Sequence, residues 1–161
     1  MEEISDVQNI EIASEGKQYI VVRLGTEQYG IDIKYVDNIV RNQRITRVPK
    51  AQHYFKGVIN LRGEIIPVMS LRLKFGLKPD EYTNATRIII IKLEQQSAIG
   101  IIVDEVKEVV TLTGSSIDKA TTSDPSDLIQ YLSGVGKHGN GLISLLNISA
   151  VIVGRESKDV V

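Results

Sequence analysis

This chain has few residues of the types that serve as catalytic groups or metal ligands, and their spacing does not match that of known catalytic or metal sites. The two histidines, His53 and His138, each lie in a turn-like segment, and neither has a second histidine or a carboxylate at the helical spacing of metal sites. Asp104 and Glu105 are adjacent, so on a strand their side chains point to opposite faces and do not form a paired acid and base. We interpret them as solvated charges. The sequence therefore predicts no catalytic, metal or cofactor site and a protein that is not an enzyme.

A glycine pattern at residues 134–139 has the spacing G-x-G-x-x-G. Phosphate-binding loops of this type pass from a strand into a helix, whereas an apolar strand follows this one. The pattern is typical of a hairpin turn here.

The composition further limits the classes of protein to which this chain can belong. The 161 residues carry a net charge of −1 and include no cysteine, which excludes disulfides and thiolate chemistry. No apolar run is long enough to span a membrane, and the acidic N-terminus is unlike a secretory signal, so we expect a cytoplasmic protein. Arg41, Arg44 and Arg47 recur every three residues, which keeps a nucleic-acid-binding barrel as an alternative. The balanced charge and the small number of aromatic residues argue against it.

The central element is a hairpin over residues 55–69, in which Gly63 supplies the turn and Arg62 lies beside it. Gly57 is also assigned to a structural turn. Residues 34–40 fit either a helical turn or the start of a strand, and residues 70–76 predict a short helix with Ser70 as its cap and Gly76 at its end. Further strands are predicted at 18–24, 28–33, 87–93 and 98–103, followed by a long loop at 113–130.

The chain also repeats itself. A shift of 70 places Gly30-Ile31 on Gly100-Ile101, and a shift of 77 places Gly57-Val58 on Gly134-Val135. Two matching blocks in one order indicate a duplicated β unit of roughly 70 residues. We predict a mainly β fold of two small five-stranded antiparallel barrels, over residues 17–83 and 84–153, with a few short helices. Residues 1–16 are predicted to be a mobile acidic tail, and 154–161 a frayed end.

Several motifs resemble the CheW family of bacterial chemotaxis adaptors. They are Tyr29-Gly30-Ile31-Asp32-Ile33, Thr46-Arg47-Val48-Pro49, Phe55-Lys56-Gly57-Val58-Ile59-Asn60-Leu61-Arg62-Gly63 followed by Ile66-Pro67, Leu71-Arg72 with Lys74-Phe75, and Gly100-Ile101-Ile102-Val103-Asp104-Glu105-Val106. The resemblance implies two SH3-like barrels without enzymatic activity. It also implies two partners, the cytoplasmic tip of a methyl-accepting chemoreceptor and the regulatory domain of the histidine kinase CheA, with no nucleic acid and no membrane insertion.

The resemblance further implies a protein that is monomeric alone, assembles in rings with CheA and lies at receptor arrays beneath the inner membrane. The kinase surface is expected near residues 31–48. The alternative is a CheW-like coupling module of a non-flagellar chemosensory pathway. The expected receptor-binding residues are Val36, Asn38, Ile39, Arg62, Val103 and Val106. Val36 and Arg62 match family positions, whereas Ile39, Val103 and Val106 are placed by the repeat. Asn38 departs from the glutamate of many relatives.

Overall fold

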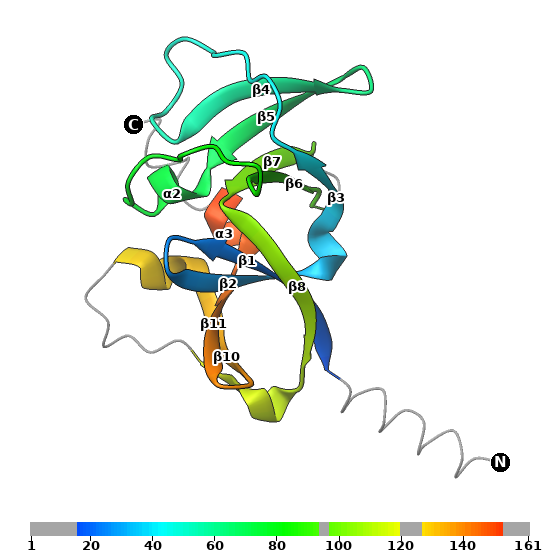
Figure 1. Ribbon diagram of the computed structural model, residues 1–161, viewed down its shortest axis with the longest axis vertical. Helices are drawn as coiled ribbons and strands as arrows, with labels where there is room; N and C mark the ends of the chain where they lie inside the picture. Colours follow the sequence, from blue (N-terminus) through cyan, green and yellow to red (C-terminus); the bar gives the residue numbers. More distant parts are fainter. Residues whose placement is uncertain (1–15, 94–96, 120–126, 153–161) are drawn as a thin grey trace, which may run out of the picture.

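The structure, a computed structural model, describes residues 16–93, 97–119 and 127–152 (Figure 1). Most of the predicted N-terminal tail, the predicted frayed end and part of the 113–130 loop lie outside these residues. The strands are β1 (Lys17–Leu24), β2 (Glu27–Asp32), β3 (Val36–Arg41), β4 (Phe55–Leu61), β5 (Glu64–Ser70), β6 (Arg87–Ile91), β7 (Ile99–Val103), β8 (Glu105–Leu112), β9 (Ile117–Asp118), β10 (Leu132–His138) and β11 (Gly141–Leu146). The helices are α2 (Leu71–Lys74), α3 (Ile148–Ile152) and the 3-10 turns η1 (Ile33–Tyr35), η2 (Gly114–Ser116) and η3 (Asp127–Tyr131).

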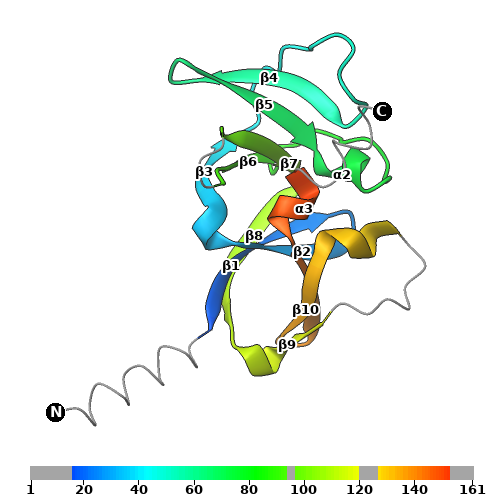
Figure 2. The same ribbon diagram turned by 180° about the vertical axis from the view of Figure 1, so that it is seen from behind.

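The strands form two sheets stacked along the long axis of the molecule (Figures 1 and 2). One sheet has six strands in the order β8-β1-β2-β11-β10-β9, and the other has five in the order β3-β6-β7-β5-β4. These sheets and the few short helices confirm the predicted mainly β class. The division into residues 17–83 and 84–153 does not separate the sheets, because β1 and β2 pair with strands of the second half while β3, β4 and β5 pair with β6 and β7.

The predicted repeat explains this exchange of strands. If β1 to β5 are matched in order with β6, β7, β8, β10 and β11, the order of the first five strands of the six-stranded sheet becomes that of the other sheet. The sixth strand, β9, also has a counterpart, because Thr46 forms a bridge with Val58 where Asp118 of β9 pairs with Val135. Each sheet therefore takes its first hairpin from one repeat and its remaining strands from the other.

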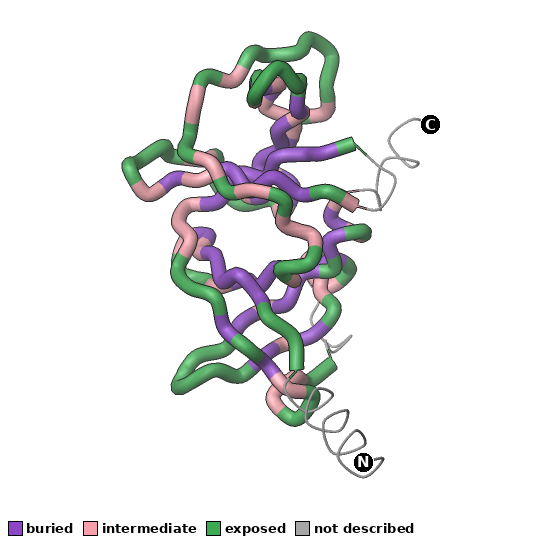
Figure 3. The backbone as a smooth tube through the Cα atoms, turned by 90° about the vertical axis from the view of Figure 1, so that its right-hand side faces the viewer, coloured by how far each residue is buried: buried purple, intermediate pink, exposed green. Residues whose placement is uncertain are grey.

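The buried apolar residues that the structure describes form three clusters, and one of them joins the two sheets. The largest lies between the sheets and contains alternate residues of β1 and β6, such as Ile20, Val22, Ile89 and Ile91. The intervening residues point the other way, into a smaller cluster on the far face of each sheet. Because both faces of β6 are covered, its nearly continuous apolar sequence is that of a buried strand. Figure 3 shows these buried strands in the middle of both lobes.

A glycine occurs in each sheet where two strands from different repeats lie parallel. Gly30 pairs with Leu145, and Gly100 pairs with Val68. A Cβ atom on Gly30 would lie 2.8 Å from Leu145 Cδ2, and one on Gly100 would lie 2.8 Å from Ile88 Cγ2. The repeated Gly-Ile motif therefore marks the position at which the exchanged strands meet.

The central hairpin forms as predicted. Arg62 (φ 54°) and Gly63 (φ 85°) both adopt the left-handed conformation of a type I′ turn, and Gly63 N donates to Asn60 Oδ1 at 3.0 Å. Gly57 was assigned wrongly, since it lies inside β4 at a break in register with β5. Its φ of 141° and the nearby Thr46 carbonyl exclude a side chain there.

The predicted helix at residues 70–76 is present in shorter form, and the ambiguous segment 34–40 is resolved. Ser70 caps α2, with its Oγ accepting from Leu73 N at 3.1 Å, and Gly76 follows the helix with a φ of 75°. The ambiguous segment 34–40 contains both possibilities, since it begins with the end of η1 and continues as β3.

Candidate protein-interaction site

The edge strand β3 carries three of the expected receptor-binding residues, Val36, Asn38 and Ile39. A β-bulge interrupts its pairing with β6 between Val36 and Asn38. Asn38 Oδ1 accepts a hydrogen bond from Ile39 N at 2.8 Å, which supports the local backbone. Bulges redirect the side chains that follow them, and Ile39 is left 37% exposed.

Strand β8 repeats this arrangement in the other sheet. Its pairing with β1 shifts between Val106 and Glu108, the repeat counterparts of Val36 and Asn38. Val109, the counterpart of Ile39, is 50% exposed. The repeat therefore places one exposed apolar side chain on each of two equivalent edge strands.

Val36 and Val106 connect these strands to the interior. Both side chains are partly buried and pack against the cluster between the sheets, Val36 from β3 and Val106 from β8. Val103 was expected among the receptor-binding residues, but the structure buries it. Its side chain is 0% exposed within the same cluster, because β7 is a central strand with both faces covered. Val103 therefore supports this region from beneath.

Arg62 lies apart from these valines along the chain, at the tip of the β4–β5 hairpin. Its side chain is exposed, and within the described residues it forms no ion pair or hydrogen bond. The hairpin tip projects toward the same side of the molecule as β3 (Figures 1 and 2). A guanidinium held on a rigid turn is well placed to donate to a polar partner group.

An ion-pair network joins the two sheets where β7 leads into β8. Arg72 in α2 donates from Nε to Asp104 Oδ1 at 2.8 Å and from Nη2 to Oδ2 at 2.5 Å. Gly25 N, in the β1–β2 turn, donates to the same Oδ2 at 2.8 Å. Arg23 completes the network, with its Nη1 3.5 Å from Asp104 and its Nε 3.3 Å from Glu105. The interpretation of Asp104 as a solvated charge was therefore wrong.

The pKa of Asp104 reflects this environment. Desolvation acts to raise the pKa of the carboxyl, but the hydrogen bonds from Arg72 and Gly25 and the charges of Arg72 and Arg23 outweigh it. The pKa consequently lies below its ordinary value. The hydrogen bond to Asp104 is also the main cause that raises the pKa of Arg72. Both groups are thus ionised at neutral pH, and their role is to hold the sheets together.

The sequence and the structure are both similar to those of a known protein family. The sequence model of the CheW-like domain matches residues 18–156. The chain belongs to the CheW-like family.

The CheW-like chain is similar in sequence to named relatives over most of its length. It is 35% identical to the chemotaxis protein CheW of Bacillus subtilis, covering 91% of this chain and 93% of the relative. It is 34% identical to CheW of Klebsiella aerogenes, covering 88% and 84%. The crystal structure of the scaffolding protein TtCheW from Thermoanaerobacter tengcongensis superposes with a TM-score of 0.77 at 32% identity, covering 84% of this chain and 87% of that one. The predicted family is confirmed, and it is a family of scaffold proteins, not enzymes.

Two features of the CheW-like site were missing from the predicted set. Val109 was aligned with Ile39 by the repeat, so the sequence already contained the signal that identifies it. The Arg72–Asp104 pair gave no such signal, because its partners are far apart in the chain. Among the described residues, no helix has the length and apolar character needed to cross a membrane.

Proposed function

We propose that this protein is a non-enzymatic chemotaxis adaptor that couples the cytoplasmic tips of chemoreceptors to the histidine kinase CheA. The main supporting observation is the pair of equivalent edge strands, β3 and β8, which each present an exposed apolar residue and a partly buried valine. The relatives named chemotaxis protein CheW support the same role.

In this proposal the receptor tip binds as a helix along the β3–β8 face. An amphipathic helix contacts its partner through an apolar stripe, and Ile39 and Val109 offer apolar surface that is accessible without rearrangement. Val36 and Val106 fix the positions of the two strands through the shared cluster. Asn38 is occupied by its bond to Ile39 N, so its contribution is to shape the bulge.

Arg62 is proposed to bind a polar or acidic group at the edge of this contact. The kinase regulatory domain is proposed to pack end to end near residues 31–48, in ring assemblies that place the adaptor at cytoplasmic receptor arrays. Because the two sheets have the same order of equivalent strands, the molecule has a similar sheet at each end for the kinase to contact.

Calorimetry with a receptor-tip fragment and a CheA regulatory domain tests this proposal. The wild-type protein should bind both, and Ile39→Ser should weaken binding to the receptor tip about tenfold, as expected for an apolar anchor. Leu142→Ser is the matched control, because Leu142 is 63% exposed on a different strand. If the protein binds neither partner at concentrations up to about 100 μM, the adaptor function is contradicted.

A further inference from the structure

A long acid-free segment crosses the end of the five-stranded sheet. Between Asp37 and Glu64 the sequence contains no aspartate or glutamate. It contains six basic residues: Arg41, Arg44, Arg47, Lys50, Lys56 and Arg62. For a chain with a net charge of −1, this is a strong local excess of positive charge.

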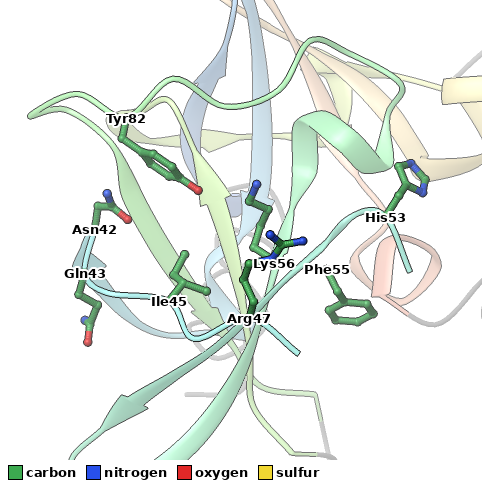
Figure 4. A pocket seen from close by; sticks show the side chains of 8 residues that line it. All are labelled: Asn42, Gln43, Ile45, Arg47, His53, Phe55, Lys56 and Tyr82. Carbon is green, nitrogen blue, oxygen red and sulfur yellow. The ribbon is translucent and has the colours of Figure 1, made fainter. Parts of the chain in front are cut away.

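Residues of this segment line three adjoining cavities. The first, of about 480 Å³, is bordered by Ile45, Arg47, Phe55, Lys56 and Tyr82, among others. A second, of about 340 Å³, shares Arg47, Phe55 and Lys56 with it, and a third, of about 480 Å³, shares Tyr82. Figure 4 shows Arg47 and Lys56 in the middle of the first cavity, between Tyr82 and Ile45 on one side and His53 and Phe55 on the other. We call this surface the basic groove.

The backbone around the basic groove is held in place. Thr46 and Val58 exchange two hydrogen bonds of 2.8 Å, which attach the segment to β4. Ile45 packs against the cluster on the outer face of the five-stranded sheet. Gly57 permits the close approach, because a Cβ atom there would lie 2.0 Å from the Thr46 carbonyl oxygen. The groove is thus preorganised, which reduces the entropy lost on binding.

Most of its cations are free to bind an anion. Within residues 16–93, 97–119 and 127–152, the lining residues Arg41, Arg47 and Lys50 take part in no salt bridge and no side-chain hydrogen bond. The residues that line the three cavities include no aspartate or glutamate. Lys56 interacts electrostatically with Asp80, which accepts a short hydrogen bond from Ser70 Oγ. The positive charge is therefore largely uncompensated.

The second repeat shows that the fold does not require this charge. Asp118 occupies the position equivalent to Thr46, since each pairs with the matching residue of β10 or β4. The corresponding connection, residues 111–133, contains Lys119 but also three aspartates. A connection with the same topology is thus acidic in one half and basic in the other, so the basic groove calls for an explanation other than folding.

The sequence itself contains a complementary segment. Residues 1–15 carry Glu2, Glu3, Asp6, Glu11 and Glu15 without a lysine or arginine, interleaved with Ile4, Val7, Ile10 and Ile12. The N-terminal end of β1 lies at the opposite end of the long axis from the β3–β4 connection (Figures 1 and 2). Residues 1–15 join the described chain at this end, so we infer that the segment can reach the opposite end of a neighbouring copy.

We propose that the basic groove binds the acidic N-terminal segment, residues 1–15, of a second copy of this chain. Its carboxylates pair with Arg47, Lys50 and Lys56, which line the cavities, and its apolar residues contact Ile45, Phe55 and Tyr82. This contact is head to tail, so it is heterologous and can link more than two copies. It would form whether or not the protein couples receptors to a kinase.

Fluorescence anisotropy with a labelled synthetic peptide of residues 1–15 tests the contact on the full-length protein. We expect saturable binding that weakens as salt is raised, because exposed charges are screened. A peptide with the five acids changed to their amides should bind at least about tenfold more weakly. Equal binding of the two peptides would overturn the proposal, and so would tighter binding of a single-stranded oligonucleotide of equal charge.

Charge-reversal variants locate the site. The double variant Arg47→Glu, Lys50→Glu should reduce peptide affinity about tenfold or more, because both side chains line the groove. The matched control is Lys92→Glu, Lys119→Glu, which changes the net charge equally at two exposed lysines outside the groove. Both variants should keep the wild-type melting temperature within a few degrees, because all four side chains are exposed. A similar loss of affinity in both would overturn the assignment.

Sedimentation velocity on the full-length protein decides whether the tail acts between copies. Association should rise with protein concentration at low salt, and should be lost when the five acids of the tail are changed to amides. A labelled tail that contacts the groove independently of protein concentration would place it on its own chain and overturn the second-copy assignment.

Discussion

Arg72 and Asp104 form a two-point ion pair at the junction of the two sheets, with Nε 2.8 Å from Oδ1 and Nη2 2.5 Å from Oδ2. Arg72 follows β5 of one sheet, and Asp104 also accepts from Gly25 in the other. The carboxylate therefore bridges the lobes that carry β3 and β8, the two strands of the proposed receptor face.

Asp104→Asn should lower the free energy of unfolding by about 1–3 kcal/mol, because the ion pairs are lost and one of the two accepting oxygens becomes an amide NH2 in a mostly buried site. Urea denaturation measures the change. Glu105→Gln is the control, since this side chain is 36% exposed and its loss should cost less than about 1 kcal/mol. Equal effects of the two substitutions would mean that Asp104 does not join the sheets.

The effect of Asp104→Asn should also depend on pH. The folded pKa of Asp104 is lowered, so its stabilisation is fully present above its ordinary pKa of 3.8 and is lost as the pH falls through the folded value. The stability difference between wild type and Asp104→Asn should therefore shrink in strong acid. Denaturation curves from about pH 7 down to about pH 2.5 would show this, and a difference that stays constant would contradict the ionic origin of the stabilisation.

Gly57→Ala should destabilise the fold by more than about 2 kcal/mol, because the new Cβ would lie 2.0 Å from the Thr46 carbonyl oxygen. Gly63→Ala provides the comparison. Its φ is also positive, at 85°, but no atom lies within 4 Å, so only backbone strain of about 1–2 kcal/mol is expected. Thermal unfolding of both variants checks the ranking, and the reverse order would refute the close contact between Thr46 and Gly57.

Arg62→Gly should separate stability from binding. Arg62 has a φ of 54°, so glycine relieves left-handed strain while adding entropy to the unfolded chain, and the net change should stay within about 1 kcal/mol. Affinity for a receptor tip should fall by several-fold if the guanidinium contacts it. Unchanged affinity, measured by calorimetry on a variant that melts normally, would remove Arg62 from the proposed site.

Adjacent residues on β8 should respond in opposite ways. Val109 is 50% exposed and Val110 is 4% exposed. Val109→Ser should weaken receptor-tip binding with little loss of stability, whereas Val110→Ser should destabilise by about 2 kcal/mol because it places a hydroxyl in an apolar cluster. A Val109→Ser variant that binds the tip normally would confine the receptor contact to β3.

Local features were predictable because their causes are local. The Arg62-Gly63 turn depends on residues that are neighbours in the chain, and the same is true of the Ser70 cap and the buried character of β6. The repeat was also visible in the sequence, since the two halves keep the same order of glycines and apolar residues. It led to Ile39 and contained the information needed to find Val109.

The amino-acid sequence alone thus determined the family, the mainly β class, the duplication and the hairpin. Only the tertiary structure decided which strands pair, because one half supplies partners to the other and residue spacing carries no information on that exchange. The burial of Val103, the bulge at Gly57 and the Arg72–Asp104 pair all result from such long-range contacts. Each depends on segments that lie far apart in the chain and meet only when the sheets assemble.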